Sequence, residues 1–232
     1  MSFFYRLGRK AAPHLLRAKW WYRALAGDED ERIKAEFNIG MLLAQQNLEE
    51  LTVYPEATPV PVVMARLADR LVNKNWTVTC TVTDSSHQHA FALPGGFIFI
   101  SHTLAQMCRN DDELAFVLGH ELAHVVKGHA MQRLAASSTA GVFQKSAARR
   151  TPVIQLLGPF IGNLLEKGYQ EDQEFDADAY AVRLMKSARF DSRAGVALLK
   201  RLHEVERDLP IISPYFAAHP PLEDRIRALQ QT

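Results

Sequence analysis

Residues 111–126 read DDELAFVLGHELAHVV, and this stretch decides the fold because it combines a helical hydrophobic pattern with a spacing of metal-binding residues. Apolar residues recur at helical spacing along it, and Asn110 or Asp111 supplies an N-cap. We therefore expect one continuous helix from Asp111 to about Leu134.

Inside that helix lie His120, Glu121 and His124. Residues four apart share a helix face, so both imidazoles can reach one metal ion. Glu121 is about 100° round the helix from His120 and can address a water on that ion. Two histidines leave two of the four positions of zinc open, so a catalytic site needs a third protein ligand and then a water.

A second predicted helix, residues 169–187, places acidic side chains beside apolar ones. Glu174 and Asp178 are four apart and share a face, so one can bind zinc while the other supports a ligand imidazole from behind. The alternative is a charged face that is exposed to solvent and has no chemistry. The spacing alone leaves both interpretations open.

Short strands are predicted before the helix that carries His120, Glu121 and His124, the HExxH helix. Residues 76–83 alternate with period two and are rich in β-branched side chains, and the apolar runs 90–93 and 97–100 are joined by Pro94-Gly95-Gly96. We expect a small antiparallel sheet of about three strands. Because proline cannot donate to a strand ladder, Pro94 places at least one of these strands at an edge of the sheet.

Helical patterns surround this sheet, which predicts an α+β fold that is predominantly helical. Further helices are expected over residues 31–50, from about Val62, and over residues 192–206 and 222–230. A length of 232 residues suits one hydrophobic core, so we expect a single domain over residues 28–232.

Residues 1–27 differ in kind from the remainder. They carry six basic residues and no acidic one, so the net charge of +1 divides into +6 for this arm and −5 for residues 28–232. Its aromatic and basic side chains suit a helix at a membrane surface. The alternative is a helix that packs on its own protein or on a second subunit, and both interpretations stay open.

Composition excludes several classes of protein. Hydrophobic residues make up 47% and charged residues 23%, which is incompatible with a disordered or collagenous chain. Two cysteines cannot form the framework of a disulfide-stapled secreted domain. The balanced charge gives no reason to expect nucleic acid as a partner. With neither a signal peptide nor an apolar spanning run evident, we expect a cytoplasmic protein, with membrane association through residues 1–27 left open.

Four segments in chain order carry a family resemblance: Ala90-Phe91-Ala92-Leu93-Pro94-Gly95-Gly96, His120-Glu121-Leu122-Ala123-His124, Glu174-Phe175-Asp176-Ala177-Asp178, and Ala218-His219-Pro220-Pro221 with Asp224-Arg225-Ile226. They resemble the zinc metallopeptidase family that contains the HtpX heat-shock proteases, the CAAX prenyl endopeptidases and the Oma-type mitochondrial proteases. The matches span about residues 60 to 230. Helices that cross the membrane in the HtpX and CAAX branches are not evident, so the chain is most similar to the soluble Oma-like branch.

The resemblance implies a zincin-type metallopeptidase domain that holds one zinc ion per chain, with the small sheet beside the HExxH helix. It also implies a role for each site residue: His120, His124 and Glu174 as zinc ligands, Glu121 as general base, Asp178 as support behind a ligand, His219 near the bound water or the oxyanion, and Arg225 as a residue that orders the site. An extended peptide is expected along the edge strand at Phe91, Ala92 and Leu93.

Three further features are His129, residues 135–168 and His89. His129 lies five residues after His124, too far round a continuous helix to share its face, so we expect it to be structural. Residues 135–168 include an apolar stretch, 152–165, that is interrupted by glycine and proline. This segment is either a lid over the substrate groove or ordinary packing. His89 stands where the family usually has asparagine.

The sequence therefore predicts a zinc endopeptidase. The resemblance implies polypeptide substrates that are unfolded, misfolded or associated with membranes. The competing hypothesis is a chaperone-like or latent binding module that contains zinc but does not turn over substrate. An intact Glu121 favours the enzyme, because a structural zinc site more often uses four protein ligands.

Overall fold

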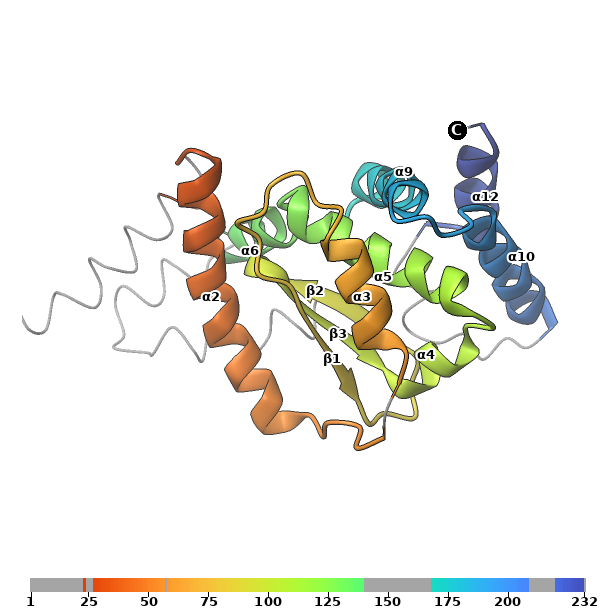
Figure 1. The fold of residues 1–232 in the computed structure, drawn as a ribbon, viewed down its shortest axis with the longest axis horizontal. Coiled ribbons are helices and arrows are strands. Elements are labelled where there is room, and N and C mark those ends of the chain that lie inside the picture. Colours follow the sequence, from red (N-terminus) through yellow and green to blue (C-terminus); the bar gives the residue numbers. More distant parts are fainter. Residues whose placement is uncertain (1–22, 24–26, 57, 140–167, 209–219, 232) are drawn as a thin grey trace, which may run out of the picture.

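The computed structural model describes residue 23 and residues 27–56, 58–139, 168–208 and 220–231, and it confirms an α+β fold dominated by helix (Figure 1). The described elements, in chain order, are α2 (Glu29–Glu50), α3 (Val60–Ala68), β1 (Thr79–Thr83), β2 (Ala90–Leu93), the 3₁₀ turn η1 (Pro94–Gly96), β3 (Phe97–Ser101), α4 (His102–Met107), α5 (Asp111–Val126), α6 (His129–Thr139), α9 (Glu171–Ser187), α10 (Arg193–Asp208) and α12 (Leu222–Gln230).

The sheet has the order β1-β3-β2, and its strand directions are mixed. β2 pairs with β3 in antiparallel fashion, as expected for two strands joined by a Pro-Gly-Gly turn, but β1 pairs with β3 in parallel. The prediction of an antiparallel sheet is therefore wrong for β1. Residues 84–96 carry the chain past the position of β3 and back, so β3 enters between its two predecessors in the direction of β1.

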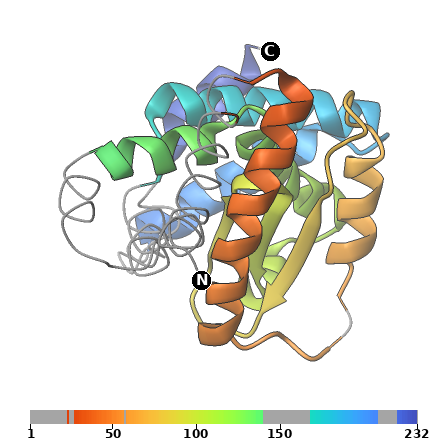
Figure 2. The same ribbon diagram turned by 90° about the vertical axis from the view of Figure 1, so that its left-hand side faces the viewer.

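Alternation along β2 and β3 gives the sheet two buried faces. Phe91, Leu93 and Phe99 belong to one apolar cluster with residues of α2 and α6, whereas Ala90, Ala92, Ile98 and Ile100 belong to a second cluster with α3, α5, α9, α10 and α12. Figure 2 shows α2 crossing the sheet on the first of these faces. The sheet is thus a middle layer, and the HExxH helix α5 lies on its other face.

Helix α2 packs on the 3₁₀ turn with almost no space between the backbones. A Cβ on Gly40 would lie 1.7 Å from the carbonyl oxygen of Pro94, and Gly95 has φ of 80° and faces the backbone of Phe37. Only glycine fits at both positions. Glu36 is buried beside this contact, where it accepts hydrogen bonds from Arg32 and from the backbone N–H of Gly95. The turn that ends the edge strand β2 is therefore fixed by α2.

Helix α5 is buried over almost its whole length, from Glu113 to Val125. The Asn110 side chain accepts a hydrogen bond from the backbone N–H of Glu113, which confirms the predicted cap. The helix does not continue to Leu134. It ends at Val126 because Gly128 takes φ of 73°, and α6 begins at the next residue.

Helix α9 approaches α5 closely. A Cβ on Gly119 of α5 would lie 3.4 Å from Ala181 of α9, so small residues on both helices allow the two backbones to come together. Among the described contacts between elements, this helix pair is the most extensive. It sets the distance across which side chains of α5 and α9 meet.

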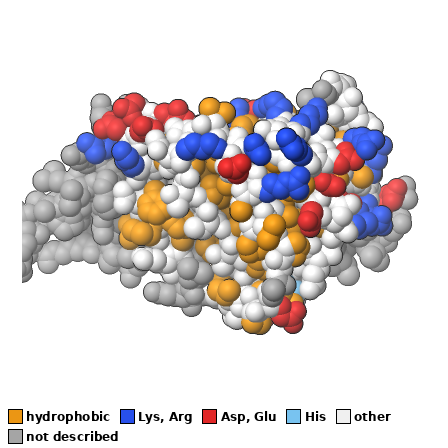
Figure 3. Space-filling model, in the orientation of Figure 1, with side chains coloured by type: hydrophobic (Ala, Val, Ile, Leu, Met, Phe, Trp, Pro, Cys, Tyr) orange, Lys and Arg blue, Asp and Glu red, His pale blue; other side chains and the backbone are white. Residues whose placement is uncertain are grey.

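The face of the molecule in Figure 3 carries basic and acidic side chains side by side, with hydrophobic side chains gathered below them over α2 and α3. Val62 of α3 is 71% exposed. Within the described residues, no helix is long and apolar enough to cross a bilayer. The basic arm 1–27 lies outside these residues apart from Arg23 and Gly27, as do residues 140–167 of the predicted lid segment.

Glu36 generates a prediction about pH and stability. Burial raises the pKa of Glu36 to about 7, although Arg32 and the Gly95 N–H act in the opposite direction. The folded protein therefore holds this proton more tightly than the unfolded chain, and the free energy of unfolding should fall as pH rises from about 4.5 to about 7. Glu36→Gln should remove that part of the pH dependence.

The measurement is the melting temperature at pH 5 and pH 8 with a metal chelator present, for the wild type, Glu36→Gln and the exposed control Lys34→Ala. The melting temperature of Glu36→Gln relative to wild type should increase between the two pH values. Equal pH dependence in all three proteins would contradict the assignment.

Candidate metal centre and its surroundings

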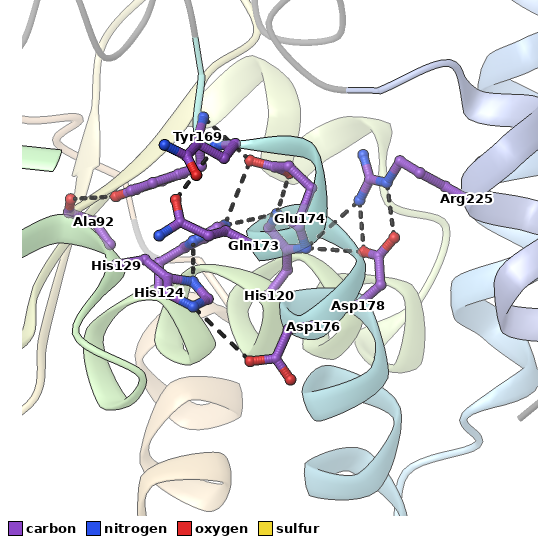
Figure 4. Close-up of polar contacts among 11 residues, drawn as sticks. Ala92, His120, His124, His129, Tyr169, Gln173, Glu174, Asp176, Asp178 and Arg225 are labelled. Carbon is purple, nitrogen blue, oxygen red and sulfur yellow. Dashed lines mark hydrogen bonds and ion pairs between the residues drawn. The ribbon is translucent and has the colours of Figure 1, made fainter. Parts of the chain in front are cut away.

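Helices α5 and α9 bring three metal-binding side chains into one buried group. His120 and His124 come from α5 and Glu174 from α9, and each side chain is at most 1% exposed. The Nε2 atoms of the two histidines are 3.1 Å apart. Oxygen atoms of Glu174 lie 3.2 Å from Nε2 of His120 and 3.7 Å from Nε2 of His124. Figure 4 shows these side chains converging from the two helices.

The geometry of this group fits a metal ion. One donor atom from each residue can be chosen so that all lie within 4.8 Å of one another. In tetrahedral zinc with bonds of about 2.0–2.1 Å, neighbouring donors are about 3.3 Å apart, close to the separations found here. Two imidazole nitrogens and one carboxylate oxygen are also a donor set that zinc accepts, with a fourth position left for water or substrate. The residues predicted as ligands thus come together as the motif requires.

Behind His120 lies a buried chain of polar contacts. It is formed by Asp178 and Arg225, the two residues predicted to support the site. Nδ1 of His120 is 2.9 Å from Oδ1 of Asp178. Arg225 of α12 donates to both oxygens of the same carboxylate, at 2.6 and 2.8 Å. Because Nδ1 of His120 faces a carboxylate, its proton belongs there, and Nε2 is left to face the metal position. Asp178 and Arg225 therefore orient His120.

The charges of this chain shift the protonation of its members. Burial alone would lower the pKa of His120, but its hydrogen bonds to Asp178 and Glu174 outweigh that effect and raise the pKa to about 9. Burial likewise acts to raise the pKa of Asp178, and the neighbouring Arg225 and His120 hold it far below its usual range. Without metal, a protonated His120 supplies the positive charge between the two carboxylates, so a metal ion must displace that proton when it binds.

Glu121, the predicted base, is buried at 2% exposure beside the two histidines. It lies near enough to Cys80 of β1 and to Tyr169 to contribute to the raised pKa of each, after the larger effect of burial. The carboxylate is thus on the side of α5 that meets the sheet and Tyr169. This is the side on which an edge-strand substrate is expected.

His129 lies next to His124, although in one continuous helix it would lie on a different face. The left-handed turn at Gly128 redirects the chain, and Nδ1 of His129 comes to lie 3.0 Å from Nδ1 of His124. Its side chain is 7% exposed, and its Nε2 is 3.8 Å from Oδ2 of Asp176. The prediction that His129 lies too far round to meet His124 is therefore wrong, because it assumed one helix across Gly128.

Tyr169 is a site residue that sequence reasoning missed. Its ring stacks on the imidazole of His124, with centroids 3.7 Å apart and an interplanar angle of 11°. Its hydroxyl donates a hydrogen bond of 3.2 Å to the carbonyl oxygen of Ala92 in β2 (Figure 4). The tyrosine therefore connects the metal group to the edge strand. No spacing rule marks it, since it precedes α9 and makes both contacts through the tertiary fold.

Two other predicted residues have different outcomes. His219 lies outside the described residues, so its place relative to the metal group stays a prediction. His89, next to β2, is half-buried, and its Nε2 lies 3.2 Å from the hydroxyl oxygen of Thr83 in β1. It bridges the ends of the two outer strands.

Comparison with known proteins agrees with this geometry. The model of peptidase family M48 matches residues 58–232. The chain is 31% identical over 144 residues to mitochondrial metalloendopeptidase OMA1 of Schizosaccharomyces pombe, a match that covers 62% of this chain and 43% of that protein. It is 32% identical over 181 residues to a CAAX prenyl protease 1 homolog of Arabidopsis thaliana, covering 63% and 41%.

A bacterial relative is covered more fully. Metalloprotease YcaL of Escherichia coli K12 is 28% identical over 174 residues, which cover 72% of this chain and 67% of that protein. By contrast, the chain spans less than half the length of the OMA1 and CAAX relatives. The residues matched by the family M48 model include the metal group of this chain.

The buried contact of Arg225 with Asp178 generates a prediction about stability. Arg225→Leu should lower the free energy of unfolding by about 3–5 kcal/mol, because it leaves a buried carboxylate without its guanidinium partner. Adding Asp178→Asn to that variant should recover part of the loss, since the neutral amide needs no counter-charge.

The measurement is urea unfolding of the metal-free protein, with Arg227→Leu as control because Arg227 lies on the same helix and is largely exposed. Additive losses in the double variant would show that the two side chains are not energetically coupled.

Proposed function

Because the chain belongs to peptidase family M48, we propose that it is a zinc-dependent endopeptidase that hydrolyses peptide bonds of unfolded, misfolded or membrane-associated proteins. The observation that carries this proposal is the buried group of His120, His124 and Glu174 with Glu121 beside it. The printed names of the relatives, among them a mitochondrial metalloendopeptidase and a metalloprotease, support the reaction type.

In this proposal His120, His124 and Glu174 hold one zinc ion. When bound, zinc supplies Lewis-acid chemistry, in which a water molecule becomes more acidic and the carbonyl of a peptide bond is polarised. The carboxylate of Glu121 takes the proton of the attacking water and delivers it to the nitrogen of the leaving amine. Cys80 and Cys108 do not belong to the group of possible ligands found among the described residues, and burial raises the pKa of both thiols to about 12.

His219 is proposed to stabilise negative charge on the carbonyl oxygen, with Arg225 and Asp178 ordering the site from behind. The support for His219 is its Ala-His-Pro-Pro motif, three residues before α12, the helix that carries Arg225. Arg225 and Asp178 have direct support in their contacts with each other and with His120.

The substrate is proposed to bind as an added strand on the outer edge of β2, at Phe91, Ala92 and Leu93. Ser101 donates its backbone N–H to the carbonyl of His89, which fixes that pair as hydrogen-bonded. By the alternation of an antiparallel ladder, Ala90 and Ala92 then direct their N–H and C=O groups away from β3. These groups can pair with the backbone of any extended peptide, which suits substrates of varied sequence.

One observation favours the latent alternative. The outward carbonyl of Ala92 already accepts a hydrogen bond from Tyr169, so the position that a substrate N–H would use is occupied. A zinc-containing module without turnover would keep this contact. The enzyme proposal instead requires Tyr169 to release Ala92 when a peptide binds.

For residues 1–27 we propose a basic arm that contacts the membrane surface, attached to a single peptidase domain over residues 28–232. The support is the charge of +6 without an acidic residue. A cytoplasmic location goes with this proposal, in which the arm supplies peripheral contact only. Sedimentation with anionic liposomes, with and without the arm, tests it.

The role of Glu121 is tested by Glu121→Gln, which keeps the shape of the side chain but cannot accept the proton. Cleavage of unstructured casein should fall by about 10²–10⁴-fold while one zinc per chain is retained. Glu171→Gln makes the same chemical change at the exposed start of α9 and should cleave as the wild type does. Unaltered cleavage by Glu121→Gln would overturn the general-base assignment, and a zinc-loaded wild type without cleavage would favour the latent module.

The role of Tyr169 is tested by Tyr169→Phe, which keeps the ring on His124 and removes the donor to Ala92. The KM for an unfolded substrate should fall about 2- to 10-fold with kcat unchanged, because one net hydrogen bond of about 0.5–1.5 kcal/mol no longer competes with the peptide. The control is Tyr180→Phe on α9. A fall in kcat would show instead that the hydroxyl acts on the reacting groups.

A further inference from the structure

A second imidazole lies directly behind His124, on the side away from the metal position. His129 starts α6, is 6% exposed as a whole residue, and places its Nδ1 3.0 Å from Nδ1 of His124 (Figure 4). A distance of 3.0 Å between ring nitrogens is that of a hydrogen bond, so one ring donates and the other accepts. The direction of this bond decides what His129 does.

The metal position fixes the direction. Nε2 of His124 faces Nε2 of His120 at 3.1 Å and Oε1 of Glu174 at 3.7 Å, so Nε2 is the atom that would bind the ion and must offer a lone pair. A neutral imidazole with its lone pair on Nε2 carries its proton on Nδ1. That N–H points at His129.

We infer that His129 is a positioning residue for the metal ligand His124: its unprotonated Nδ1 accepts the hydrogen bond from His124 and thereby fixes both the tautomer and the orientation of that ring. This inference rests on the metal site proposed above, which it deepens. The remaining proton of neutral His129 then lies on Nε2, which is directed towards the Asp176 carboxylate at 3.8 Å. That distance allows electrostatic attraction without a direct hydrogen bond.

The two metal-binding histidines are thus oriented by different chemistry. His120 has a buried carboxylate at its Nδ1, provided by Asp178. His124 has a neutral imidazole at the same atom, and its ring face is covered by Tyr169 at 3.7 Å. A second buried carboxylate at this point would add negative charge to a group that already contains Glu174 and Asp178. An imidazole accepts the same hydrogen bond without that charge.

The backbone is built to hold His129 at this position. Gly128 adopts φ of 73°, a conformation that an L side chain rarely takes, and so turns the chain back towards His124. Asp176 is in turn held by Lys127, whose Nζ lies 3.1 Å from Oδ2 of Asp176. Gly128 thus directs His129 towards His124, and Lys127 holds the carboxylate that faces the other ring nitrogen of His129.

The test compares His129→Ala with His129→Asn in the full chain. The Oδ1 atom of asparagine can take the place of Nδ1 as an acceptor, whereas alanine offers none. Zinc affinity is measured by competition with a chromogenic chelator, and the melting temperature of each metal-free protein is measured beside it. The control is His102→Ala, which removes a half-buried imidazole whose contacts are Tyr54, Asp84 and Ser85.

His129→Ala should bind zinc about 10–100-fold more weakly than the wild type, the usual effect of losing the partner behind a metal-binding histidine. His129→Asn should stay within about threefold of the wild type, and His102→Ala should bind zinc normally. A His129→Ala protein that binds zinc as the wild type does would overturn the inference. So would a His129→Asn protein as weak as His129→Ala, because a packing role would not distinguish the acceptor.

Nitrogen NMR of the zinc-loaded wild type measures the tautomer of His129 independently. His129 should be neutral with its proton on Nε2. A proton on Nδ1 would overturn the inference. The same experiments distinguish a failure of the proposed metal site from a failure of the proposed role of His129. If the wild type binds no zinc, the metal site itself is wrong. If the wild type binds zinc and both His129 variants bind it equally, only the role of His129 is wrong.

Discussion

The close packing of α5 against α9 is the constraint on which the rest of the structure depends. Small residues at Gly119 and Ala181 let the two helices approach, and this approach places Glu174 and Asp178 against the imidazoles of α5. The result is a buried cluster of charge that apolar packing alone would not tolerate. Arg225 supplies positive charge that makes this burial possible, joined by a protonated His120 in the metal-free protein or, on our proposal, by the metal ion that replaces that proton.

The same packing couples the metal group to the sheet. Helix α5 covers the face of β2 that carries Ala90 and Ala92, and Tyr169 at the start of the α9 segment reaches the carbonyl of Ala92. Directly after β2, α2 fixes the Pro94–Gly96 turn through Gly40. The edge strand thus packs on α5 and is bonded by Tyr169, both of which also adjoin the metal group, and on our proposal a peptide that pairs with this edge would lie beside Glu121.

Local spacing predicted much of this arrangement. The pairs His120 with His124 and Glu174 with Asp178 are each four apart on a buried helix, so each pair had to share a face. Local spacing did not predict three other features, because they depend on the path of the chain through the fold. They are the direction of β1, the contact of His129 with His124, and the contact of Tyr169 with Ala92. One left-handed residue, Gly128, ends α5 and brings His129 back, and hydrophobic periodicity does not register such a turn.

The most direct test of the proposed zinc centre is a titration of zinc into the metal-free protein, with cleavage of a quenched unstructured peptide followed at each step. Activity should be absent in the chelated protein, rise in proportion to bound zinc, and stop rising at one zinc per chain. Cleavage that persists in the chelated protein, or zinc that binds fully without any cleavage, would contradict the proposal that His120, His124 and Glu174 hold the ion at which peptide bonds are hydrolysed.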